Sequence, residues 1–167
     1  NTIPDYNIGL STSLNWKGVS LYALINHSAK FDVYNQPLQW GTFKRFTGIY
    51  DQTGVNEAER KPIGYYDAWY AVSGLATSSI FIEDASFTKL REVSLSYRIT
   101  PSMMANIPGM SSFSSIGLNL SGRNLFTWSD YRGYDPENGE TGGDTGSAAI
   151  ARVDGYNYPN FRTFSAS

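Results

Sequence analysis

The residues that could carry out chemistry in this chain are few. His27 is the only histidine, and there is no cysteine, which excludes disulfides, thiol chemistry and cysteine-based metal sites. No Ser/His/Asp arrangement can be assembled around His27, and no pair of catalytic carboxylates with a defined pocket can be argued. The sequence therefore predicts that the protein is not an enzyme. His27 stands at the end of an expected strand and is interpreted as a polar group at an interface.

An acidic run with interspersed glycines, DPENGETGGD, contains the only candidates for metal ligands. They are Asp135, Glu137, Glu140 and Asp144. Carboxylate oxygens are ligands that Ca²⁺ prefers, but the spacing of an EF-hand loop and its closing Glu are missing. We interpret the run as a solvated outer loop, with divalent-cation binding as the alternative. No cofactor is expected.

Aromatic residues are concentrated in two segments without regular periodicity. Aromatic rings stack on sugar rings and pack on partner proteins, so these side chains are candidates for contacts with a substrate or a partner. The alternative is that they pack their own loops together or against the rest of the protein. The candidates are Trp40, Tyr65, Tyr66, Trp69, Tyr70, Tyr131 and Tyr134.

Several segments alternate strictly between apolar and polar residues, which is typical of β-strands with two different faces. These strands are expected to position the loops that carry the aromatic and acidic candidates. One face is predicted to carry Ile8, Leu10, Leu14, Val93, Leu95, Ile116, Leu118 and Leu120. The opposite face is predicted to carry Ser11, Ser13, Ser94, Ser96, Asn119 and Ser121, together with the charges of Arg98 and Arg123. We expect these two arginines to pair with carboxylates of another domain or with each other, and a substrate-binding role is the alternative.

The pattern predicts about five antiparallel strands. They are a hairpin over Tyr6–Ser28 with its turn at Lys17-Gly18, a strand over about Thr88–Ile99 that pairs with one over Ser114–Trp128, and a fifth beginning in NFRTFSAS. Between the hairpin and the third strand no periodicity lasts, apart from a short helical turn expected around Val33–Gln36 before Pro37.

Connection lengths and composition favour a membrane β-barrel over a soluble sandwich. Connections alternate between short and long, and the polar face holds Ser, Asn and Gly rather than the Lys and Glu of a solvated sheet. Trp16 and Tyr97 lie near the short-turn ends, and Tyr6 and Trp128 near the long-loop ends, as aromatic girdles do. The net charge of −2 gives no reason to expect nucleic acid as a partner.

Several motifs resemble the C-terminal barrel of the SusC/RagA family of TonB-dependent outer-membrane transporters. They are PDYNIGLSTSLNWKGVSLYALI, VYNQ, KPIGYYDAWY, FIEDASFTKLREVSLSYRI, SGRNLFTWSDYRGYDPE and YPNFRTFSAS, which occur in the family's order. The resemblance implies that residues 1–167 are a fragment holding about the last five strands of a barrel with roughly 22 strands and long extracellular loops. The plug domain and TonB box of the family are expected upstream.

The resemblance also implies a location and partners. The location is the outer membrane of a Gram-negative bacterium. The implied partners are a SusD-like surface lipoprotein, the TonB complex, outer-membrane lipid, and an oligosaccharide or peptide substrate. The alternative is an outer-membrane or surface β protein with a binding or adhesive role and no transport. The apolar face is accordingly expected to meet lipid and the polar face the barrel lumen.

Overall fold

The computed structural model describes residues 1–43, 51–62, 64–67, 79–105, 108–109, 113–137 and 152–167. The chain forms two compact units, which are described separately. The strand unit comprises Asp5–Ala29, Phe87–Ser129 and Asn160–Ser167, and the loop unit comprises Asn1–Pro4, Lys30–Ser86 and Asp130–Pro159. Among the described residues, no helix has the length and apolar character needed to cross a membrane.

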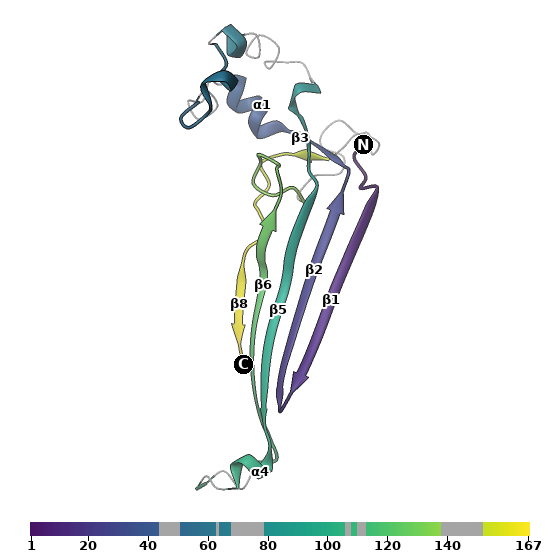
Figure 1. Ribbon diagram of the computed structural model, residues 1–167, viewed down its shortest axis with the longest axis vertical. Helices are drawn as coiled ribbons and strands as arrows, with labels where there is room; N and C mark the ends of the chain where they lie inside the picture. The colour runs from purple at the N-terminus through teal and green to yellow at the C-terminus, as the bar shows by residue number, and fades with distance from the viewer. Residues whose placement is uncertain (44–50, 63, 68–78, 106–107, 110–112, 138–151) are drawn as a thin grey trace. The chain divides into compact units, whose positions relative to one another are not determined.

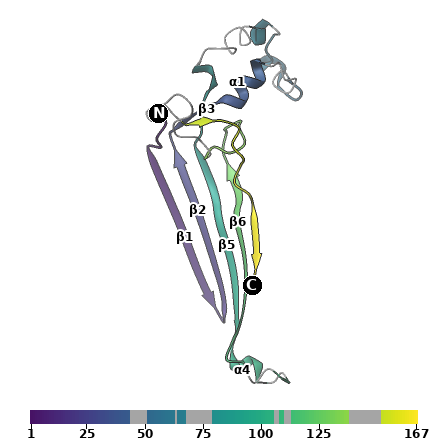
Figure 2. The ribbon, with the colours of Figure 1, turned by 180° about the vertical axis from the view of Figure 1, so that it is seen from behind.

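The strand unit is a five-stranded antiparallel sheet with the order β1-β2-β5-β6-β8 (Figure 1). Its strands are β1 (Tyr6–Trp16), β2 (Val19–Ala29), β5 (Phe87–Ile99), β6 (Ile116–Trp128) and β8 (Thr163–Ala166). The predicted hairpin and the predicted pairing of the third and fourth strands are both confirmed. The view from behind shows β1 and β8 at the two edges (Figure 2), so the sheet is open and does not close on itself.

A two-residue turn joins β1 to β2. Lys17 and Gly18 both have positive φ, at 46° and 87°, which is the backbone of a type I′ hairpin turn. Gly18 also fits a tight space, since a Cβ there would lie 3.0 Å from the backbone oxygen of Arg98. The predicted turn at Lys17-Gly18 is therefore confirmed, with a glycine where the conformation favours one.

The β5–β6 connection begins where the sequence predicts the strand to end. β5 stops at Ile99, and Pro101 opens the short helix α4 (Pro101–Met104). Proline cannot donate to a strand ladder but is tolerated in the first turn of a helix. Thr100-Pro101 therefore ends one element and begins the next.

The loop unit contains a second sheet that the sequence pattern did not predict. β3 (Asp32–Asn35) pairs antiparallel with β4 (Ile82–Asp84) and parallel with β7 (Val153–Asp154). Val33 and Phe81 are fully buried, and the ring of Tyr34 meets that of Phe81 edge-on with centroids 6.1 Å apart. These three short strands bring segments far apart in sequence into one small core. Two 3₁₀ turns, η1 (Glu57–Glu59) and η2 (Ser79–Phe81), also belong to this unit.

The expected helical turn around Val33–Gln36 is wrong. Residues 32–35 form β3, and the helix α1 (Gln36–Phe43) begins after them. Asn35 caps this helix, because its Oδ1 accepts a hydrogen bond of 2.9 Å from the Leu38 amide. Pro37 therefore lies in the first turn, where its missing N–H costs nothing, and does not terminate the helix.

Candidate functional site

The cross-strand register divides the sheet of the strand unit into two chemically different faces. On one face, Leu14 lies opposite Leu21, which lies opposite Leu95, which lies opposite Leu120. All eight apolar residues predicted for this face share it, and none of them is buried. Leu10 is 66% exposed and Leu118 54%. The apolar face extends over four neighbouring strands, and soluble monomers rarely expose large contiguous apolar patches to water.

The opposite face carries the small polar side chains, as predicted. Ser20 lies opposite Ser96, and Ser96 opposite Asn119. Ser94 donates a hydrogen bond of 3.0 Å to Oδ1 of Asn119. An open hollow of about 580 Å³ lies at the short-turn end and is lined in part by these serine and asparagine residues.

Both predicted arginines lie on this polar face. The structure gives Arg123 a partner that the sequence analysis did not name: its Nε lies 3.2 Å from Oε2 of Glu92, the residue opposite it in the register. Arg98 lies opposite Gly117. The alternation of residues therefore predicted on which face these charges lie. It could not predict the ion pair, because a bulge between Leu90 and Glu92 shifts the pairing of β5 with β6 and so determines which residue lies opposite Arg123.

Aromatic residues mark both ends of the apolar face. Trp16 lies beside the two-residue turn, and Tyr97 lies opposite Val19 in the same region. At the other end, the rings of Phe126 and Trp128 stack with centroids 5.9 Å apart. His27 belongs to this end, where its Nδ1 is 2.9 Å from the Thr88 hydroxyl and its ring 5.9 Å from that of Tyr6. His27 therefore has a polar and an aromatic neighbour within the strand unit, and its interpretation as an interfacial polar group stays a prediction.

A polar cluster in the loop unit connects the segment after β6 with the small sheet. Glu83, on β4, accepts hydrogen bonds from the Arg132 guanidinium, including one of 2.7 Å from Nε, and from the side-chain amide of Asn35 at 3.3 Å. The Glu83 side chain is only 11% exposed, whereas the Arg132 side chain is 58% exposed, so the carboxylate is buried and the guanidinium faces solvent. Neither Glu83 nor Arg132 was predicted, because no local pattern relates residues 49 positions apart.

Tyr131 makes the second connection, and it packs within its own loop unit, which is the alternative given for the aromatic candidates. Its side chain is buried, and its hydroxyl donates a hydrogen bond of 2.7 Å to Oδ2 of Asp154 on β7. Burial, followed by the hydrogen bond to Asp154, raises the pKa of Tyr131 well above its ordinary value. Gly133 leaves room for the ring, since a Cβ at that position would lie 2.3 Å from Cε1 of Tyr131. As placed, Tyr131 holds its loop in position and is not available to a ligand.

Exposed aromatic side chains remain close to this connection. Tyr134 is 71% exposed, and Tyr156, with φ of 67°, is 49% exposed. Partial burial, then the neighbouring Tyr134 and Asp154, raise the pKa of Tyr156. Tyr158 is 84% exposed. The sequence analysis missed Tyr156 and Tyr158, although the Tyr-Asn-Tyr-Pro spacing was a possible signal.

The remaining aromatic candidates lie elsewhere in the loop unit. Trp40, on α1, is 41% exposed. The rings of Tyr65 and Tyr66 meet edge-on at 5.3 Å, and Nζ of Lys61 lies 5.8 Å from the Tyr65 ring centroid. Trp69 and Tyr70 are outside the described residues. The structure thus brings Tyr65 and Tyr66 together and leaves parts of both rings and of Trp40 accessible.

The predicted acidic run is described only in its first part. Oδ1 of Asp135 accepts a hydrogen bond of 3.0 Å from the Glu137 amide, a local turn contact. Glu140 and Asp144 lie outside the described residues. Within the described part of the chain, no three acidic, histidine or cysteine residues cluster in a way that could hold a metal ion.

Comparison with known proteins shows partial homology to TonB-dependent receptors. No protein-family model matches the chain. The TonB-dependent receptor P26 of Formosa agariphila is 31% identical over 172 residues, covering 98% of this chain. The TonB-dependent receptor P3 of the same organism is 25% identical over 169 residues, covering 97%. The chain spans 16% of the length of each relative, so it is homologous to part of such receptors.

Solved structures of similar fold come from the RagAB peptide importer. Its open-open state superimposes with a TM-score of 0.63 and 21% identity, covering 99% of this chain and 17% of that chain. The closed-closed state gives a TM-score of 0.62 and also 21% identity. The antiparallel sheet described above therefore matches part of this fold.

Proposed function

We propose that residues 1–167 form the C-terminal portion of the barrel of a TonB-dependent transporter in the outer membrane of a Gram-negative bacterium. The observation that carries the proposal is the open antiparallel sheet with one exposed apolar face and one face of small polar groups. β1 and β2 have 11 residues each, and a tilted transmembrane strand needs about 9–11. In this proposal lipid covers the apolar face, and the polar face, with Arg98 and Arg123, lines the lumen.

Two free edges support placement within a larger barrel of about 22 strands. Within the described ranges of the chain, β1 and β8 each have a strand neighbour on one side only. Open edges do not occur within the hydrocarbon region of a membrane, because unpaired backbone groups cannot be hydrated there. Neighbouring strands of the same receptor would satisfy both edges.

The substrate and partners of this proposal follow from the loops and the relatives. The exposed aromatic residues of the loop unit supply rings suited to stacking on sugars or packing on a protein surface. We include a SusD-like lipoprotein as a partner at these loops and the TonB complex as the source of energy. Peptides and oligosaccharides are the proposed substrate classes, the former because the structurally similar RagAB is a peptide importer.

Uptake measurements test this function. Labelled peptide and oligosaccharide pools would be supplied to the parent strain, to a strain lacking the gene and to a strain lacking TonB. We expect uptake of one pool to fall in both mutant strains and to return when the gene is restored. Surface binding that depends on the gene but not on TonB, with unchanged uptake, would instead favour the adhesive alternative.

A further inference from the structure

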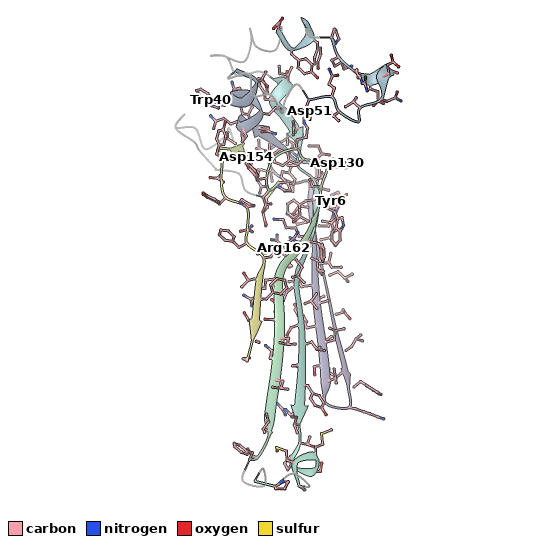
Figure 3. All side chains as sticks on the ribbon, turned by 90° about the vertical axis from the view of Figure 1, so that its left-hand side faces the viewer. Tyr6, Trp40, Asp51, Asp130, Asp154 and Arg162 are labelled. Carbon is pink, nitrogen blue, oxygen red and sulfur yellow. The ribbon has the colours of Figure 1, made fainter. Side chains whose placement is uncertain are left out.

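Arg162 is a cation at one edge of the apolar face of the strand unit. In β8, Phe164 lies opposite Gly122, and Ala166 opposite Leu120, so both are on the apolar face. Arg162 precedes Phe164 by two positions, and its guanidinium carbon lies 5.7 Å from the ring centroid of Phe126. Phe126 lies opposite Leu90, which continues the apolar face to the neighbouring strand. Figure 3 marks Arg162 where β8 begins, beyond one end of that strand.

The surroundings of Arg162 are aromatic. Phe126 stacks on Trp128, and Phe164 is about three-quarters exposed, at 76%. Among the described strand residues that share this face, the register places no Asp or Glu. The side chain is exposed. The charge is therefore not neutralised by a carboxylate of these strands, and it lies within an aromatic belt typical of a lipid interface.

We propose that Arg162, supported by Phe126 and Trp128, binds the phosphate group of a lipid in the outer leaflet of the membrane. This inference rests on the function proposed above, in which this end of the sheet faces the cell exterior. A guanidinium presents parallel N–H donors that match two phosphate oxygens, and the ring beneath it limits its freedom. The exposed ring of Phe164 would meet the acyl chains, so one site recognises both parts of an anionic lipid.

Lipid binding by the complete receptor tests the site. Lipid A, used as the probe, would be titrated into the detergent-solubilised receptor, and bound lipid counted by native mass spectrometry. We expect Arg162→Gln to weaken binding by about tenfold, the loss of one charge-assisted contact. Arg162→Lys should retain most of the affinity, because the cation remains. Arg98→Gln is the matched control, which removes the same charge from the polar face of the same sheet and should leave binding unchanged.

Three results would overturn the site. They are equal affinity of the Arg162→Gln and parent receptors, an equal loss in Arg98→Gln, and displacement of lipid A by inorganic phosphate at similar concentration. The last would mean that the acyl chains contribute nothing. Heat-modifiable migration of the receptor from outer-membrane fractions is measured in parallel. If the parent protein is absent from that fraction, the proposed function is contradicted. If parent and variants are inserted alike, a difference in lipid binding tests the lipid site alone.

Discussion

The hydrogen bond between Tyr131 and Asp154 shows how single residues hold the loop unit together. Asp154 is 1% exposed, and among the described residues its Oδ1 has no hydrogen-bond partner, so the Tyr131 hydroxyl is an important contact for this carboxylate. A buried polar atom left without a partner costs about 1–3 kcal/mol. In the part of the chain that the structure describes, a side-chain hydrogen bond therefore joins the segment after β6 to β7.

Removing this hydroxyl should loosen the small sheet. We expect Tyr131→Phe to destabilise the pairing of β3 with β7 by about 1–3 kcal/mol, because Asp154 then loses its donor. The measurement is hydrogen exchange of the Tyr34 amide, which donates to the Arg152 carbonyl at 2.8 Å. Tyr134→Phe removes an exposed hydroxyl and is the control, with a change within about 0.5 kcal/mol. Equal exchange in both variants would show that the contact does not stabilise the sheet.

The raised pKa of Tyr131 also predicts a pH dependence. Its stabilising contribution is complete below the ordinary value of 10.0 and is lost as pH rises above it, because the unfolded state then releases a proton that the folded state retains. Protection of the Tyr34 amide should therefore fall more steeply above pH 10 in the parent protein than in Tyr131→Phe. Parallel curves for the two proteins would contradict this assignment.

Periodicity predicted the long strands because each alternates over many residues. A shift of one position in the pairing of β6 (Ile116–Trp128) would move all its apolar side chains to the polar face. The long alternation therefore specifies which face each of its residues occupies. The small sheet could not be predicted in this way. β3, β4 and β7 contain four, three and two residues, too few for a period, and β7 is separated from β3 by more than a hundred positions.

The two faces of β6 provide a matched test at the level of the strand. Leu120 and Ser121 are adjacent but lie on the apolar and polar faces. If lipid covers the apolar face, Leu120→Arg should destabilise the inserted receptor by about 2–4 kcal/mol near the bilayer midplane. Ser121→Arg, which adds the same charge toward the lumen, should cost much less. Denaturant titration in vesicles measures both, and similar losses would contradict the assignment of the faces.

At the candidate site, the sequence predicted which residues lie on which face but not which side chains contact one another. Strand periodicity could place Arg98 and Arg123 on the polar face, but it could not predict that Glu92 pairs with Arg123. Aromatic content indicated Tyr131 and Tyr134 equally, although one is buried and the other exposed. The difference depends on Asp154, a partner 23 positions away from Tyr131 that only the folded chain identifies.

At the scale of the molecule, stability should depend on neighbouring strands and lipid. Among the described residues, the edge strands β1 and β8 each have a strand neighbour on one side only, and apolar side chains such as Leu10 and Leu118 on the apolar face are exposed. We therefore expect this chain alone to aggregate in plain buffer and to need detergent for a defined size. Size-exclusion chromatography with circular dichroism measures this. A sharp monomer peak with cooperative thermal unfolding in plain buffer would favour a self-contained soluble domain.

The central claim, that the sheet crosses the outer membrane, is tested most directly by labelling the two ends of β1. The chain has no cysteine, so single replacements at Asp5 and Lys17, which flank opposite ends of this strand, introduce unique thiols into it. The parent receptor serves as the background control. With a membrane-impermeant maleimide on intact cells, we predict labelling of Asp5→Cys and none of Lys17→Cys until the outer membrane is permeabilised. Equal labelling of both ends in intact cells would contradict the account.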